Sequence, residues 1–383
     1  MTGHDLRPRL VVAANSFWNL RNFRGGLIRE LSWAGFDLTS VAPPGGENAG
    51  ADLPGRLVPL PMRSDGLNPL TDLRLMRSFA ALLRRERPAA LLSWTAKPNI
   101  YGALAARLVG VPALPNVSGL GTAFIRGGLL QIFLSFLYRK AFASCPAVFF
   151  QNVEDLELFV AKRLVRRDQV RLLPGSGVDL VKFACQPMPQ EDGPLRLLFV
   201  GRLLGDKGVR ELAAAARVLK RENAPVAVQL LGFAGVENRT AITPSELEGW
   251  VREGIVSYLG NTHDVRPWLA QAHAVVLPSY REGLPRSLLE AASTGRPLLA
   301  SDVPGCRDVV ESGINGLLFP VRSPEGLANA IRQWVALGEQ ERAAMGKAAR
   351  RTAEARFSEK RVIDAYLREL AVAMERPVER APC

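Results

Sequence analysis

Cysteine is scarce in this chain: only four of its 383 residues are cysteines. They stand far apart and form no Cys-x-x-Cys pair, at positions Cys145, Cys185, Cys306 and Cys383. Disulfide frameworks and zinc sites both need closely or regularly spaced cysteines. The spacing therefore argues against both, and favours reduced thiols in a cytoplasmic protein.

The usual ligands for a divalent metal are also missing. The sequence contains no Asp-x-Asp motif, and its three histidines, His4, His263 and His273, do not form a cluster. Magnesium and manganese sites are built mainly from carboxylate oxygens. We therefore expect no metal and no other cofactor, and we expect His263 and His273 to have structural roles.

Several classes of protein are disfavoured by what the sequence lacks. It has no apolar run of about 18 residues, which a membrane-spanning helix needs. The early apolar segment "RLVVAA" is shorter than that of a secretory signal, and we expect it to be the first strand. No helix-turn-helix, zinc or RNA-binding signature is present, which argues against a nucleic-acid partner. No complete Gly-x-Gly-x-x-Gly follows the first strand, which argues against a Rossmann dehydrogenase.

The chain has instead an excess of positive charge, with 49 Lys and Arg against 37 Asp and Glu. Such an excess favours an anionic partner. The basic residues gather in two amphipathic segments, "DLRLMRSFAALLRRERP" and "GGLLQIFLSFLYRKAF". The arginines concerned are Arg74, Arg77, Arg84, Arg85 and Arg139. They suit contact with anionic lipid, to which Leu130, Phe133 and Phe136 would add apolar insertion. The alternative is ordinary packing of both helices on their own sheet.

Strand-like and helix-like segments alternate along most of the chain, which predicts an α/β protein with doubly wound parallel sheets. We expect two Rossmann-like domains, residues 1–175 and 195–355, facing a central cleft. Residues 176–194 are rich in Pro and Gly and predict a hinge. Residues 356–383 predict a C-terminal helix that crosses back to the first domain. Ligands of open parallel sheets bind at the carboxyl ends of the strands.

Two carboxylates mark one of these strand ends, in "HAVVLPSYREGLPRSLLEAASTG". The pattern predicts a buried strand, a loop that contains Glu282, and a helix that contains Glu290 about two turns along. Both side chains would then face the same edge, where carboxylates can accept hydrogen bonds from sugar hydroxyls. The alternative is a capping acid followed by a solvent-facing helix glutamate.

The segment "SYREGLPRSLLEAASTGRPLLASDVPGCRDVVESGINGLLFP", with "FVGRLLGDKGVRELAAAA" before it, closely resembles the retaining glycosyltransferases of the family 4 type, whose fold is GT-B. The resemblance implies metal-independent transfer from a nucleotide sugar, with Arg202, Lys207 and Glu282 as catalytic residues. Arg202 and Lys207 would hold the donor diphosphate, where cations stabilise the departing anion. Glu282, Gly283 and Leu284 would contact the donor sugar, and Glu290 the ribose. Gly25 and Gly26, in "NFRGGLIREL", match a glycine-rich loop that approaches the donor phosphate at a helix start.

The segments "SWTAKPNIYGALAARLVG" and "NVSGLGTAFI" are similar to a narrower group, whose bacterial members extend polyprenyl-diphosphate-linked sugars. This resemblance implies an acceptor side formed by Lys97, Asn99, Tyr101, Asn116 and Gly119, and a protein peripheral to the inner face of the cell membrane. It also favours a UDP-linked N-acetylhexosamine as donor, and it identifies no catalytic base. A transferase with a soluble acceptor and a non-catalytic nucleotide-sugar-binding protein are the alternatives.

Overall fold

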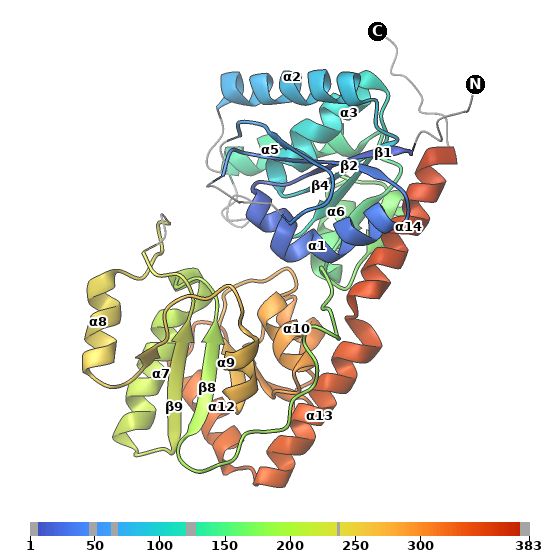
Figure 1. Cartoon of the computed structure of the whole chain (residues 1–383). Helices are drawn as coiled ribbons and strands as arrows, with labels where there is room; N and C mark the ends of the chain where they lie inside the picture. The colour runs from blue at the N-terminus through green and yellow to red at the C-terminus, as the bar shows by residue number, and fades with distance from the viewer. Residues whose placement is uncertain (1–6, 46–51, 63–67, 120–127, 236–237, 376–383) are drawn as a thin grey trace. The chain divides into compact units, whose positions relative to one another are not determined.

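The computed structural model describes residues 7–45, 52–62, 68–119, 128–235 and 238–375. The chain divides into two compact units, each built on a parallel sheet (Figure 1). Unit 1 comprises Met1–Ser176 and Glu359–Cys383, and unit 2 comprises Gly177–Ser358. Two α/β units with parallel sheets are the predicted fold class, which is confirmed.

Unit 1 contains a seven-stranded sheet in the order β3-β2-β1-β4-β5-β6-β7. The strands are β1 (Arg9–Ala13), β2 (Asp37–Ala42), β3 (Arg56–Pro59), β4 (Ala90–Trp94), β5 (Ala113–Val117), β6 (Val148–Phe150) and β7 (Val170–Leu172). Neighbouring strands pair in parallel. The central strands are nearly continuous apolar runs, because helices cover both faces of the sheet.

Two apolar clusters lie on the two faces of this sheet. The first joins it to α2 (Pro69–Glu86), η1 (Pro98–Gly102), α3 (Ala103–Val109), α5 (Gly128–Phe142) and α6 (Val153–Ala161). The second joins it to α1 (Phe17–Trp33) and α14 (Glu359–Glu375). A short turn, η2 (Arg167–Gln169), precedes β7. Figure 1 shows α2 and α3 on one side of the sheet and α1 on the other.

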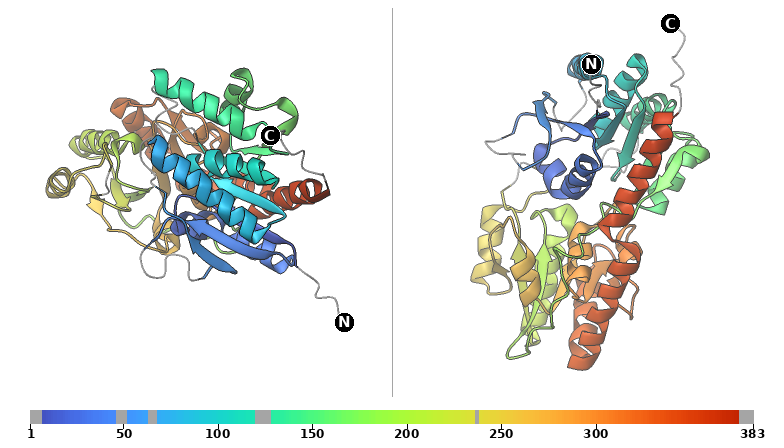
Figure 2. Two further views of the ribbon diagram at one scale, coloured as in Figure 1. Left: turned by 90° about the horizontal axis from the view of Figure 1, so that it is seen from above. Right: turned by 45° about the vertical axis from the view of Figure 1, so that its right-hand side comes forward.

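The C-terminal helix α14 is part of the core of unit 1, although it follows unit 2 in the sequence. Its Tyr366 is fully buried, and the ring centroid lies 4.3 Å from that of Phe149 and 5.9 Å from that of Trp94. The Tyr366 hydroxyl accepts a hydrogen bond from Asn116 Nδ2 at 2.8 Å. Figure 2 shows α14, in red, beside the strands and helices of unit 1.

The extent of helix α1 differs from the prediction made for Gly25 and Gly26. The helix begins at Phe17, where the Ser16 side chain accepts a hydrogen bond from the backbone N–H of Asn19 and caps it. Gly25 and Gly26 therefore lie in the middle of a helix, and the prediction that they form a loop at a helix start is wrong. A Cβ atom at Gly26 would lie 2.2 Å from the Glu359 carboxylate. The Glu359 carboxylate, at the start of α14, therefore occupies the space next to Gly26.

Unit 2 contains a six-stranded parallel sheet in the order β10-β9-β8-β11-β12-β13. The strands are β8 (Leu195–Val200), β9 (Val226–Leu231), β10 (Ser257–Tyr258), β11 (Ala274–Leu277), β12 (Leu298–Ser301) and β13 (Gly316–Phe319). The helices are η3 (Gly205–Lys207), α7 (Val209–Arg221), α8 (Pro244–Arg252), α9 (Arg266–Gln271), α10 (Arg286–Ser293), α11 (Cys306–Val309), α12 (Pro324–Ala336) and α13 (Glu339–Arg356). One apolar cluster unites them.

Most of the segment that was expected to be a hinge belongs to unit 2, because charged side chains hold its backbone there. Arg296 donates to the carbonyl of Pro187 at 2.8 Å, and Arg342 binds the Glu191 carboxylate at 2.6 and 2.9 Å. The buried His273 ring lies 3.2 Å from the carbonyl of Gln190. The chain instead changes units at Ser176–Gly177 and at Ser358–Glu359.

Candidate active site

The candidate site lies at the carboxyl ends of the strands of unit 2, where loops follow β8, β11 and β12. The loop after β11 contains Glu282 and packs closely on the connection between β12 and α11. At their contact Gly305 has a φ of +77°, and a Cβ atom there would lie 2.2 Å from the carbonyl oxygen of Gly283. Only glycine fits this position, so the Glu282 loop has a defined place on the sheet.

Lys207 and Glu282 form an ion pair at this edge, from Nζ to Oε1, although 75 residues separate them in the sequence. The side chains are 26% and 11% exposed, so Lys207 is partly accessible and Glu282 is mostly enclosed. Cys306 is buried close to them, and burial raises the pKa of its thiol well above the usual value. This thiol is therefore protonated and is not a candidate nucleophile.

Arg202 lies two residues after the end of β8, in the connection that leads to Lys207. Its side chain is exposed, and it forms no ion pair with any residue that the structure describes. One arginine and one lysine thus belong to the same short connection between β8 and α7. Together they can stabilise an anionic group at this edge.

Glu290 is enclosed within unit 2 and does not point into solvent. Its side chain is 12% exposed, and Oε1 accepts a hydrogen bond from Arg286 Nε at 2.7 Å. Burial raises the pKa of Glu290, and Arg286 and Lys182 oppose that rise. Helix α10 is capped by Pro285 without a side-chain hydrogen bond, so Glu282 does not cap it. The alternative of a capping acid and a solvent-facing glutamate is thus wrong on both counts. Gly283 and Leu284 lie between the two acids, with Leu284 buried.

Two of the five predicted acceptor-side residues meet at an acid that the sequence analysis missed. Lys97 Nζ donates to Asp72 Oδ1 at 2.8 Å, and the Tyr101 hydroxyl donates to Asp72 Oδ2 at 3.0 Å. Asp72 lies in the first turn of α2, and Lys97 and Tyr101 follow the carboxyl end of β4. Thr95 has a φ of +70° in the same connection, an uncommon conformation for a threonine.

The other three acceptor-side residues occupy different environments. Asn99 and Asn116 are buried, and Asn99 Nδ2 donates to the backbone carbonyl of Asn116 at 2.7 Å. Ser93 donates to Asn99 at 2.9 Å, so both asparagines brace the ends of β4 and β5 from inside. Their side chains are not exposed to an acceptor. Gly119 has a φ of +140° and open space where a Cβ would lie.

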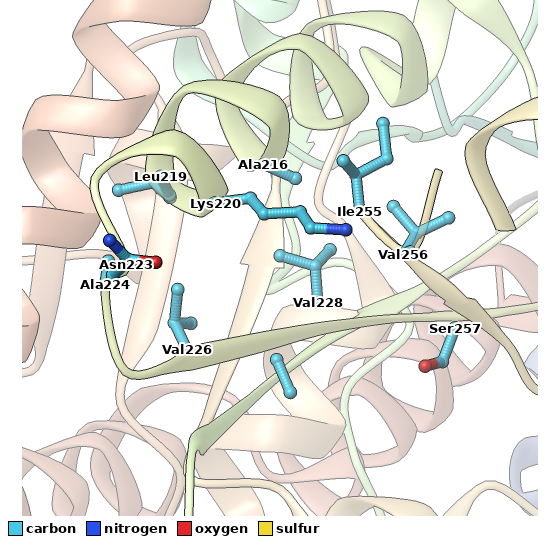
Figure 3. Close-up of a pocket in the computed structure, with 12 residues that line it drawn as sticks. Ala216, Leu219, Lys220, Asn223, Ala224, Val226, Val228, Ile255, Val256 and Ser257 are labelled. Carbon is cyan, nitrogen blue, oxygen red and sulfur yellow. The ribbon is translucent and has the colours of Figure 1, made fainter. Parts of the chain in front are cut away.

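A pocket of about 360 Å³ lies at the other end of the unit 2 sheet, where β9 and β10 begin. Figure 3 shows Lys220 crossing it between Leu219, Val228 and Ile255. The Lys220 ammonium donates to the backbone carbonyl of Glu253. None of the predicted site residues lines this pocket. It is therefore separate from the candidate site, which lies in the loops at the carboxyl ends of the strands.

Neither a metal cluster nor a spanning helix is found among the residues that the structure describes. No group of three or more His, Cys, Asp or Glu side chains there is placed to hold a metal ion. Within the same part of the chain, every helix is too short or too polar to cross a membrane.

The two parallel-sheet units match the fold of GT-B glycosyltransferases. Residues 21–175 match the family model described as a glycosyl transferase 4-like domain, and residues 194–336 match the model described as glycosyl transferases group 1. The chain belongs to this family of two-domain glycosyltransferases. The prediction of the family and of its fold is confirmed.

Relatives with assigned activities and a solved structure agree with this assignment. The chain is 27% identical over 281 residues, 69% of its length and 72% of the relative's, to the N,N'-diacetylbacillosaminyl-diphospho-undecaprenol alpha-1,3-N-acetylgalactosaminyltransferase of Campylobacter jejuni. It is 26% identical over 275 residues, 68% of its length and 70% of the relative's, to the UDP-Gal:alpha-D-GlcNAc-diphosphoundecaprenol alpha-1,3-galactosyltransferase of Escherichia coli. Sucrose-phosphate synthase of Thermosynechococcus elongatus has the same fold, with a TM-score of 0.77, 19% identity, and coverage of 95% of this chain and all of that one.

Proposed function

We propose that this glycosyltransferase moves a hexose or N-acetylhexosamine from a UDP-linked donor to a polyprenyl-diphosphate-linked saccharide during assembly of a bacterial polysaccharide or glycan. The observation that carries the proposal is the Lys207–Glu282 pair at the strand ends of unit 2. The acceptor class rests on the two relatives from Campylobacter jejuni and Escherichia coli, which act on undecaprenol-diphosphate-linked sugars.

Each candidate residue then has a defined task. Arg202 and Lys207 bind the donor diphosphate and stabilise the negative charge that grows as it departs. Glu282, released from Lys207 when the diphosphate arrives, accepts hydroxyl hydrogen bonds from the transferred sugar. Glu290 accepts hydrogen bonds from the ribose diol, and Arg286 holds its carboxylate in place.

The proposed transfer retains the configuration at the anomeric carbon. The bond from the anomeric carbon to the diphosphate oxygen breaks, and the acceptor hydroxyl oxygen bonds to that carbon on the same face. The acceptor proton passes to the departing diphosphate oxygen, so no side-chain base is needed. On the acceptor side, Lys97 remains a candidate contact, held by Asp72, to which the buried Tyr101 also donates.

We also propose that unit 1 rests on an anionic membrane surface, with α5 as its main contact. The exposed side of α5 includes Leu130, Ile132, Phe133 and Phe136, which are 45%, 66%, 46% and 54% exposed. The helix contains no acidic residue and ends in Arg139 and Lys140. In α2, by contrast, Phe79 and Leu83 are buried in the unit's own core, and the exposed side of the helix includes the predicted arginines Arg74, Arg77, Arg84 and Arg85.

The decisive experiment incubates purified protein with a panel of nucleotide sugars and an undecaprenyl-diphosphate-linked sugar. The product is weighed by mass spectrometry, and its new linkage is assigned by NMR. We expect one hexose or N-acetylhexosamine to be added, in the donor's anomeric configuration. Transfer to water-soluble saccharides alone would favour the soluble-acceptor alternative. Binding of a donor without transfer to any acceptor would favour a non-catalytic nucleotide-sugar-binding protein.

Metal independence is a separate part of the proposal, and it rests on the missing Asp-x-Asp motif. We expect turnover to be unchanged when EDTA is present, because cationic side chains and backbone N–H groups meet the diphosphate charge. A loss of turnover with EDTA that manganese or magnesium restores would contradict this part.

A further inference from the structure

Tyr280 links the two loops that contain Lys207 and Glu282. It follows β11 and precedes Glu282 in the same loop. Its backbone N–H donates to the carbonyl of Asp206 at 3.0 Å, and its hydroxyl donates to Glu211 Oε1 at 2.6 Å. Asp206 directly precedes Lys207, and Glu211 lies in the first turn of α7. One tyrosine is thus bonded to the chain on both sides of Lys207.

A third element holds the tyrosine by its ring. The guanidinium of Arg322, which follows β13, lies 4.5 Å from the centre of the Tyr280 ring. Arg322 has a φ of +57°, a backbone conformation that residues other than glycine adopt at a free-energy cost. Cations favour the face of an aromatic ring, so this contact helps to compensate that cost.

The hydroxyl contact with Glu211 is a strong one. It joins a neutral donor to a carboxylate, and such charge-assisted bonds are shorter and stronger than neutral ones. Burial and the Glu211 carboxylate raise the pKa of Tyr280 to about 12, so the hydroxyl keeps its proton at physiological pH. The other oxygen of Glu211 is buried and accepts no hydrogen bond from the described residues. Tyr280 is therefore the only described side chain that donates a hydrogen bond to this carboxylate.

We propose that Tyr280 is a positioning residue of the donor site, which holds the loop that contains Lys207 beside the loop that contains Glu282, with Arg322 bracing its ring. Its importance for catalysis rests on the proposed function, because Lys207 and Glu282 act there on the diphosphate and on the sugar. In this proposal Tyr280 itself contacts neither the diphosphate nor the sugar. It acts by joining the loop after β11 to the loop after β8, so that both present their side chains together.

Tyr280→Phe tests the proposal because it removes the hydroxyl and keeps the ring. A hydrogen bond to a charged group contributes about 1.5–3 kcal/mol. If much of that contribution fixes the loops, we expect kcat to fall by about tenfold or more and UDP to bind several-fold more weakly. Amide hydrogen exchange in residues 201–208 and 279–285 should become faster together. Glu211→Gln keeps an acceptor for the hydroxyl and removes only its charge, so it should have smaller effects in the same direction, and the double variant should add little to Tyr280→Phe alone.

The matched control is Glu253→Gln, on the far side of unit 2. Glu253 accepts two hydrogen bonds from Arg217, at 2.7 and 2.9 Å, at the other end of α7. Glu253→Gln should leave kcat, UDP binding and amide exchange in the two loops unchanged. Arg322→Ala keeps the hydroxyl contact and removes the brace, so it provides a second variant if Tyr280→Phe does not fold. It should show a smaller change in the same three measurements.

Wild-type values of kcat, UDP affinity and loop exchange in both Tyr280→Phe and Arg322→Ala would overturn the proposal. A lower melting temperature without any change in kcat, UDP affinity or exchange of the two loops would also overturn it, because it would show general stabilisation only. Failure of the proposed function looks different: wild type would neither bind UDP nor transfer sugar. Loop exchange would still report then whether Tyr280 joins the two loops.

Discussion

At the scale of single residues, several of the candidate side chains form charge pairs within their own unit. Lys207 pairs with Glu282, Arg286 with Glu290, and Lys97 with Asp72. Each pair holds side chains that would otherwise sample many rotamers, and under the proposed function a ligand exchanges one partner for another. This arrangement reduces the entropy lost when substrate binds. It also predicts that substitutions within a pair will not act independently.

The Lys207–Glu282 pair gives the first prediction. Lys207→Ala should lower turnover by at least about a hundredfold, because one charge contact to a developing anion contributes roughly 2.7–4 kcal/mol. It also leaves the Glu282 carboxylate without its cation, close to the donor diphosphate. The double variant with Glu282→Gln should therefore lose less than the sum of the two single variants. Turnover of purified variants with unchanged circular dichroism measures this, and near wild-type turnover of Lys207→Ala would contradict it.

Glu290 gives a prediction about pH. Its ionised form accepts hydrogen bonds from both hydroxyls of a ribose diol more strongly than its protonated form does, and burial raises its pKa while Arg286 lowers it. UDP affinity should therefore fall as the pH falls through the pKa of Glu290. Arg286→Ala removes a cation that lowers this pKa, so the midpoint of the fall should move to higher pH. Arg286→Lys should keep the midpoint closer to that of wild type.

Calorimetric titration of UDP at a series of pH values measures both midpoints. The control is another basic residue that pairs with an acid four positions away on a helix, at an exposed place outside the site. Lys360→Ala, which loses the exposed contact with Asp364, serves this purpose and should leave the midpoint in place. An unchanged midpoint in Arg286→Ala would show that Arg286 does not tune Glu290.

At the scale of elements, close backbone contacts decide where the loops lie. Gly305 and Gly313 have φ angles of +77° and +82°, yet only Gly305 faces a neighbouring backbone. Gly305→Ala should lower both the melting temperature and turnover, because its Cβ would displace the loop that contains Glu282. Gly313→Ala has open space and should show only the cost of the backbone conformation, about 1 kcal/mol. Equal turnover in the two variants would argue against a role for the Gly305 contact in the site.

Helix α1 is a second element in which the surroundings of glycine residues matter for the local structure. Two adjacent glycines usually suggest a loop, because glycine weakens a helix by about 1 kcal/mol relative to alanine. Here the cap at Ser16, the buried Leu20, Leu27 and Leu31, and the approach of α14 outweigh that cost. The helix therefore continues through both residues. The cap at Ser16 and the spacing of the leucines are local signals, whereas the packing of α14 on α1 is a contact that only the tertiary structure shows.

At the scale of the whole molecule, the prediction concerns attachment to membranes. Purified protein should bind vesicles that contain phosphatidylglycerol and should be released by salt, because the attraction decays over roughly 8 Å at physiological ionic strength. Arg74→Glu with Arg84→Glu should weaken binding, since each basic residue near such a surface contributes about 1 kcal/mol. A second double variant, Ile132→Asp with Phe136→Asp, should also weaken binding, because it removes apolar insertion.

The control for the apolar substitutions is Val181→Asp, in unit 2. Val181 is 88% exposed, so its replacement should leave vesicle binding unchanged. Co-sedimentation with vesicles measures all the variants. If wild type does not sediment, or if both double variants sediment as wild type does, α2 and α5 are ordinary packing elements.

The sequence by itself determined the alternation of strands and helices, the two parallel sheets and the stretch that contains Glu282 and Glu290. These follow from hydrophobic periodicity and turn residues, which act over short distances along the chain. Only the tertiary structure decided which charges meet. Lys207 and Glu282 are 75 residues apart, Lys97 and Asp72 are 25 apart, and Asn116 and Tyr366 are 250 apart. Such contacts depend on how whole elements pack on a sheet, and no local pattern contains that information. For the same reason the roles of Asp72, Tyr280 and Arg286 were not predicted, and neither was the packing of residues 177–194 on unit 2.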